Sequence, residues 1–152
     1  MNQPPEHYIL VTEERLLAFA TECFRRAGCE DDHAALIARL LVNNDLRGVR
    51  SHGTQSAAGY CTGLVEGGYN PRPDVRVVHQ TETVVVVDRY VRGIRDGHDP
   101  VPGTDRVLLP GAIEAERMER YRVEGIPYGE PEQDAARVLH ERFEVPLPWE
   151  EL

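Results

Sequence analysis

Apolar residues recur every three or four positions in the first part of the chain, which is the spacing of an amphipathic helix. The clearest stripe consists of Leu16, Ala20, Cys23 and Ala27. Thr12 precedes this stripe as a good N-cap, and Gly28 follows it where helices commonly end. The pattern therefore predicts a helix between these two residues.

Two further helices are predicted before the first proline-rich connector. The second helix begins near Asp31 or Asp32 and ends at about Leu46. The third covers residues 53–66, and Ser51 is its plausible N-cap. Its many glycine and alanine residues would allow another helix or another chain to approach closely.

The rest of the pattern mixes strands and helices. Residues 1–11 carry two prolines and are expected to lie along the surface. Two β-branched runs, at residues 75–78 and 83–87, predict a hairpin or two adjacent strands. Two more helices are predicted over residues 110–124 and 132–143. The inward-facing residues of the last helix are Ala136, Leu139 and Phe143.

Composition narrows the class of protein. The 152 residues, 41% of them hydrophobic and 28% charged, are typical of one soluble globular domain. A net charge of -9 argues against binding nucleic acid or an anionic membrane, and no apolar run reaches the roughly 20 residues that span a bilayer. The start of the chain lacks the features of a signal peptide, and three unpatterned cysteines favour a reducing cytoplasm.

Charged groups of both signs surround a serine-glycine turn directly after the second predicted helix. Residues 43–53 read Asn-Asn-Asp-Leu-Arg-Gly-Val-Arg-Ser-His-Gly. The guanidinium groups of Arg47 and Arg50 suit a carboxylate, and the imidazole of His52 suits acid or base chemistry near neutral pH. Free amides at a helix N-terminus beside Ser51 would also favour an anion. This segment could hold a small anionic substrate, with His52 as its catalytic residue.

A purely structural interpretation of the same segment stays open. Ser51 would then only cap a helix, and His52 would only fill a bend. Asp45 would join Arg47 and Arg50 in a surface salt-bridge cluster or an interface.

A second cluster, Asp-Gly-His-Asp at residues 96–99, contains side chains that ligate metals. Three potential ligands within four residues can rarely all face one ion without a partner segment. We therefore expect a solvated loop and no metal site there.

The segment from Asp45 to Gly53 closely resembles the Asp-Leu-Arg-Gly-x-x-Ser-His-Gly signature of the malate/L-lactate dehydrogenase-like family. These proteins are nicotinamide-dependent 2-oxoacid reductases without a Rossmann fold. Their Ser-His-Gly segment lines the substrate pocket, so the resemblance implies that Ser51 and His52 do so here. The remaining substrate-binding residues that we expect are Arg47, Arg50 and Tyr60.

The resemblance extends along most of the chain, but the centre of the family is missing. Residues 1–88 resemble the N-terminal part of the family and residues 106–152 its C-terminal part, with residues 89–105 as a junction loop. Only 13 residues separate Asp88 from Pro102, where the family carries its nicotinamide-binding region. The two outer parts come together in space in the family. We therefore expect a single α+β domain, mostly helical, with N- and C-terminal helices packed together and a small antiparallel β element.

The missing region changes the expected function. Without it we expect no cofactor, and the chain should not be an NAD(P)-dependent dehydrogenase by itself. Ser56 also stands where the family usually has an arginine that grips the substrate carboxylate.

Three functions stay open. The first is a non-redox protein that binds a small carboxylate or carbonyl compound, or performs an acid–base step with His52. The second is a subunit that works with a full-length dehydrogenase, and the third is a structural or interaction protein. A homo-oligomer is expected, because loss of the cofactor region should leave apolar surface uncovered.

Overall fold

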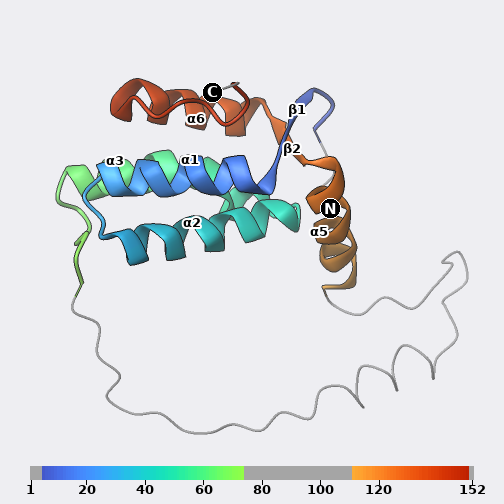
Figure 1. Ribbon diagram of the computed structural model, residues 1–152, viewed down its shortest axis with the longest axis horizontal. Coiled ribbons are helices and arrows are strands. Elements are labelled where there is room, and N and C mark those ends of the chain that lie inside the picture. The colour runs from blue at the N-terminus through green and yellow to red at the C-terminus, as the bar shows by residue number, and fades with distance from the viewer. Residues whose placement is uncertain (1–4, 74–110, 151–152) are drawn as a thin grey trace, which may run out of the picture.

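The computed structural model describes residues 5–73 and 111–150. Its elements in chain order are β1 (Tyr8–Val11), α1 (Glu13–Arg26), α2 (Asp31–Leu46), α3 (Ala57–Val65), α5 (Ala112–Glu124), β2 (Ile126–Gly129) and α6 (Glu130–Phe143). Figure 1 shows α1 between α6 and α2, with α5 at one end of this stack. This arrangement confirms the predicted class, which is α+β and mostly helical.

Several sequence predictions concern parts of the chain outside the described residues. They are the two strands at residues 75–78 and 83–87, the junction loop at residues 89–105 and the cluster at residues 96–99.

The first helix begins and ends where the sequence predicts. The Thr12 side chain caps α1 by accepting a hydrogen bond from the Arg15 amide at 3.3 Å, and two glutamates occupy the first turn. The predicted stripe is buried. Gly28 follows the C-cap with a φ of +102°, a conformation that glycine adopts without a steric penalty. The predicted boundaries of this helix are confirmed.

The second helix also matches its predicted range, and it packs along α1. Its buried face consists of Ala34, Ala38, Leu41, Val42, Asp45 and Leu46. One of these six residues is a carboxylic acid, which is unusual for a helix face inside a protein core. The opposite face leaves Leu36 and Leu40 exposed.

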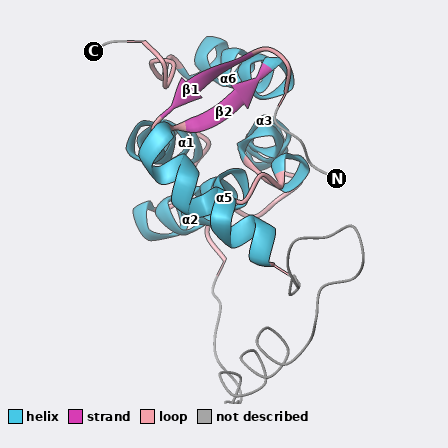
Figure 2. Cartoon of the chain, turned by 90° about the vertical axis from the view of Figure 1, so that its right-hand side faces the viewer, coloured by secondary structure: helices cyan, strands magenta, loops and turns pink. Residues whose placement is uncertain are grey.

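A short strand lies near the start of the described residues, and the sequence analysis missed it. Tyr8–Val11 pairs antiparallel with Ile126–Gly129, and Val11 lies opposite Ile126. Figure 2 shows the two strands side by side. Both paired residues are buried, so this short sheet ties the start of the chain to its C-terminal part.

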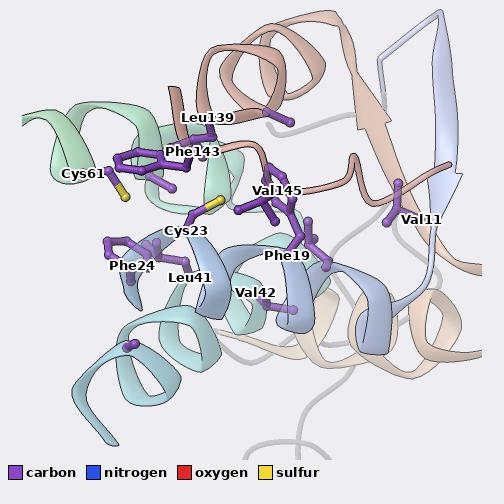
Figure 3. Packing of buried hydrophobic residues seen from close by; sticks show 14 of the residues in the cluster. Val11, Phe19, Cys23, Phe24, Leu41, Val42, Cys61, Leu139, Phe143 and Val145 are labelled. Atoms are coloured by element: carbon purple, nitrogen blue, oxygen red, sulfur yellow. The ribbon is translucent and has the colours of Figure 1, made fainter. Parts of the chain in front are cut away.

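The last helix closes the core from the C-terminal side. Ala136, Leu139 and Phe143 are buried, as predicted, and Figure 3 shows Leu139 and Phe143 near Cys61 of α3. The helix starts two residues earlier than predicted, at Glu130. The reason is that the Glu132 carboxylate accepts a hydrogen bond from the Gly129 amide at 2.9 Å and so closes the first turn.

All three cysteines are buried free thiols. None of the helices in the described ranges is both long and apolar enough to cross a membrane.

Candidate functional site

The segment that joins α2 to α3 contains two short turns of 3-10 helix. They cover Arg50–His52 and Thr54–Ser56, and the α-helix begins only at Ala57. The prediction that Ser51 caps a helix starting at residue 53 is therefore wrong. The Ser51 hydroxyl lies 3.0 Å from Nδ1 of His52.

The turn is held in place by Asp45, whose side chain is only 2% exposed. Oδ2 of Asp45 accepts two hydrogen bonds from Thr54, at 2.9 Å from the backbone amide and 2.7 Å from the hydroxyl. Since the Thr54 hydroxyl proton points to Asp45, the Tyr128 hydroxyl donates to Thr54 Oγ1, at 2.9 Å. This buried chain of hydrogen bonds connects α2, the turn and β2.

The position of Asp45 corrects the sequence analysis, which grouped it with Arg47 and Arg50 in a surface cluster. It lies on the buried face of α2, seven residues after Ala38 and four after Leu41. That spacing was visible in the sequence. Its hydrogen-bond partner Thr54 was not visible, and neither was Tyr128, which bonds to Thr54 from 74 residues further along the chain.

Gly53 leaves space for the Asp45 carboxylate. A Cβ atom at position 53 would lie 1.7 Å from Oδ1 of Asp45. The backbone angles of Gly53 are extended, with φ -93° and ψ -158°, so other residues could adopt them. Glycine is required here by close packing and not by backbone conformation.

Burial dominates the electrostatics of Asp45. Desolvation raises the pKa of its carboxyl from 3.8 to about 7, although the hydrogen bonds from Thr54 oppose this shift. Oδ1 has no hydrogen-bond partner among the described residues. Burial also raises the pKa of Tyr128 above its ordinary value. The Tyr128 hydroxyl therefore stays protonated at neutral pH, while Asp45 can change its charge there.

The turn presents Ser51 and His52 on the surface, and both residues are exposed. The backbone carbonyl oxygens of Ser51 and His52 each accept a hydrogen bond from a side chain. Asn44 Nδ2 donates to the His52 carbonyl at 2.9 Å, and the Ser56 hydroxyl donates to the Ser51 carbonyl at 3.1 Å. Because Nδ1 of His52 is engaged with Ser51, Nε2 is the ring nitrogen that can meet a ligand.

The other expected site residues lie around this turn at different depths. Arg47 is exposed and follows the last turn of α2, while Arg50 is half-buried in the first 3-10 turn. Tyr60 lies on α3, and its ring meets that of Tyr69 edge-on at 6.4 Å. The described structure thus joins Ser51 to His52 directly, and it gives Tyr60 a different contact.

The described helices differ in how their N-termini would meet the pyrophosphate of a dinucleotide, which is usually held at a helix N-terminus. In the described part of the chain, α3 carries no acidic residue in its first turn, whereas α1, α2, α5 and α6 do. These charges would repel a pyrophosphate. Within residues 5–73 and 111–150 there is also no group of three or more His, Cys, Asp or Glu residues that could hold a metal ion.

The chain belongs to the malate/L-lactate dehydrogenase family, whose model matches residues 11–90. It is 36% identical over 83 residues to malate dehydrogenase of Pyrococcus horikoshii. This alignment covers 55% of this chain and 23% of the relative. It is 31% identical over 67 residues to L-sulfolactate dehydrogenase of Methanocaldococcus jannaschii, and the alignment covers 44% of this chain and 20% of that relative. It is 38% identical over 52 residues to ureidoglycolate dehydrogenase (NAD(+)) of Escherichia coli, and the alignment covers 34% of this chain and 15% of that relative.

A solved structure of malate dehydrogenase from Pyrococcus horikoshii OT3 is also similar, with 37% identity and a TM-score of 0.48. The match covers 52% of this chain and 23% of that one. The chain thus spans less than a quarter of the length of the relatives it matches. The matched region contains the turn with Ser51 and His52. The resemblance of residues 106–152 to the family's C-terminal part stays a prediction.

Proposed function

We propose that this chain binds a small 2-hydroxy or 2-oxo carboxylate at the Ser51–His52 turn. The three relatives are named for malate, L-sulfolactate and ureidoglycolate. Each of these compounds has a hydroxyl group on the carbon next to a carboxylate. The shared chemistry of the ligand is therefore an oxygen that can bond to an imidazole beside an anion that can bond to a guanidinium.

One observation carries the proposal, namely that the buried Asp45 holds a turn on which Ser51 and His52 are joined and exposed. A site works best when its side chains are fixed before the ligand arrives, because less entropy is then lost on binding. Nε2 of His52 would contact the hydroxyl or carbonyl oxygen of the ligand. Arg47 or Arg50 would meet the carboxylate.

The proposed role is non-redox. Hydride transfer in a nicotinamide-dependent reaction requires a bound cofactor held against the substrate, and we expect none because only 13 residues separate Asp88 from Pro102, where the family carries its nicotinamide-binding region. His52 can still move a proton to or from a ligand oxygen. We propose binding, or such an acid–base step, in the reducing cytoplasm that the three free thiols favour.

A second candidate function is a subunit that works with a full-length NAD(P)-dependent dehydrogenase. The exposure of His52 favours this candidate, because a small-molecule pocket usually encloses most of its ligand. A partner would then close the site and supply the nicotinamide. An interaction protein without a ligand is the third candidate.

The His52→Ala variant tests the proposal. We expect the wild-type chain to bind L-malate saturably in calorimetry and to bind succinate more weakly, since succinate lacks the 2-hydroxyl group. His52→Ala should weaken L-malate binding by about tenfold or more, because one hydrogen bond to a charged or polar ligand is lost. Its free energy of unfolding should change by less than about 0.5 kcal/mol, because the side chain is exposed.

His7→Ala is the matched control, since His7 is also an exposed histidine. It should bind L-malate like the wild type. Binding of L-malate only after a full-length dehydrogenase is added would favour the second candidate. If L-malate binds neither to the chain alone nor in the presence of a full-length dehydrogenase, the third candidate, an interaction protein without a ligand, is favoured.

A further inference from the structure

An arginine side chain from the C-terminal part of the chain lies against the end of α2. Arg117 is half-buried on α5, four residues before the buried Tyr121 and so on the same side of that helix. Helix α5 packs beside α2 (Figure 2), and the Arg117 side chain contacts Gly48, the second residue after α2. Arg117 therefore borders the candidate site from a part of the chain that the sequence analysis did not connect to it.

Gly48 makes this close approach possible. It is buried and has a φ of +73°, a conformation that favours glycine. A Cβ atom at position 48 would lie 3.1 Å from Cδ and 3.2 Å from Nη1 of Arg117. The chain then folds tightly into the turn, because the His52 amide donates to the Val49 carbonyl at 3.1 Å. The guanidinium of Arg117 thus rests on the backbone that leads into the Ser51–His52 turn.

Three arginines lie around Gly48, since Arg47 precedes it and Arg50 follows two residues later. Neither Arg47 nor Arg117 makes an ion pair with any residue that the structure describes. Arg50 is partly committed, because its charge opposes the rise in the pKa of Asp45. In a chain with a net charge of -9, this local excess of positive charge is unusual. A half-buried guanidinium has lost part of its hydration, and a bound anion would offset that loss.

We propose that Arg117 determines the specificity of the Ser51–His52 site by binding a second anionic group of the ligand. This inference rests on the proposed function, in which His52 contacts the hydroxyl or carbonyl oxygen and Arg47 or Arg50 binds the adjacent carboxylate. Arg117 comes from a different helix and meets an anion at the other end of the ligand. Its planar guanidinium suits a carboxylate, to which it can donate two parallel hydrogen bonds. The site therefore prefers a 2-hydroxy dicarboxylate to a 2-hydroxy monocarboxylate.

Calorimetry with L-malate and L-lactate tests the proposal. The two compounds share the 2-hydroxy carboxylate, and only L-malate has a second carboxylate. We expect the wild-type chain to bind L-malate at least about tenfold more tightly than L-lactate. Arg117→Gln should weaken L-malate binding by about tenfold or more and leave L-lactate binding unchanged, because it removes only the partner of the second carboxylate.

Two further variants separate this role from general effects of charge and folding. Arg120→Gln removes the same charge from α5, but Arg120 is exposed and pairs with Glu124 at 3.8 Å. It should keep the preference for L-malate. Arg117→Lys keeps the positive charge without the planar fork, and its affinity for L-malate should fall between those of the wild type and Arg117→Gln. Circular dichroism checks that each variant is folded, and Arg117→Lys carries the test if Arg117→Gln does not fold.

The possible failures are distinguishable. A wild-type chain that binds both ligands equally well would overturn the role of Arg117 and leave the proposed function intact. The same holds if the Arg117 variants weaken both ligands equally or weaken neither. A folded wild-type chain that binds neither ligand would overturn the proposed function and this inference together.

Discussion

Replacing Gly53 by alanine is expected to destabilise the chain by about 3 kcal/mol or more. The new Cβ would lie 1.7 Å from Oδ1 of Asp45, far closer than two such atoms can approach. The carboxylate cannot retreat without losing its two hydrogen bonds from Thr54, and no other described residue bonds to Oδ1. Urea unfolding followed by circular dichroism measures the loss.

Gly59→Ala is the matched control for this substitution. Gly59 lies within α3, and a Cβ atom there would meet no atom within 4 Å. Alanine should stabilise this exposed helical position by roughly 0.5–1 kcal/mol. Equal effects of the two substitutions would contradict the account of Gly53 as a packing requirement.

The second large effect concerns the dependence of stability on pH. The folded-state pKa of Asp45 is raised to about 7, so the folded chain holds this proton more tightly than the unfolded chain does. The resulting stabilisation is fully present below about pH 4 and is lost as the pH rises through about 7. Each unit of pKa shift corresponds to about 1.4 kcal/mol. The chain should therefore lose stability between these two pH values.

Asp45→Asn isolates this contribution. Asparagine keeps the shape of the side chain and an oxygen that can accept from Thr54, but it does not titrate in this range. Urea midpoints measured from pH 4.5 to pH 8 should fall more steeply for the wild type than for the variant. Parallel pH profiles for the two proteins would show that Asp45 does not change its charge in the folded state.

The helices near the start of the chain could be predicted because their signals are local. Thr12 and Gly28 mark the ends of α1, and the spacing of apolar residues identifies its buried face. The strands β1 and β2 could not be found this way. Each has four residues, one contains Pro127, and each is stabilised by a partner more than 100 residues away.

The candidate site was predictable in part. The motif in residues 43–53 identified Ser51 and His52, which the structure joins by a side-chain contact. It did not reveal that Asp45 is a buried anchor, because its partner Thr54 lies in a later turn and Thr54 is bonded by Tyr128 of β2. The cap predicted for Ser51 failed because Thr54 satisfies Asp45 and starts a second 3-10 turn before α3.

The most direct test of the proposed ligand site is a nuclear magnetic resonance titration of histidine-labelled protein with L-malate. The ring signal of His52 can be assigned by its absence in His52→Ala. The account predicts that this signal shifts saturably as L-malate is added, while the signal of His7 stays in place. A His52 signal that does not move in the folded protein, at any concentration of L-malate, would contradict the proposal that the Ser51–His52 turn binds a 2-hydroxy carboxylate.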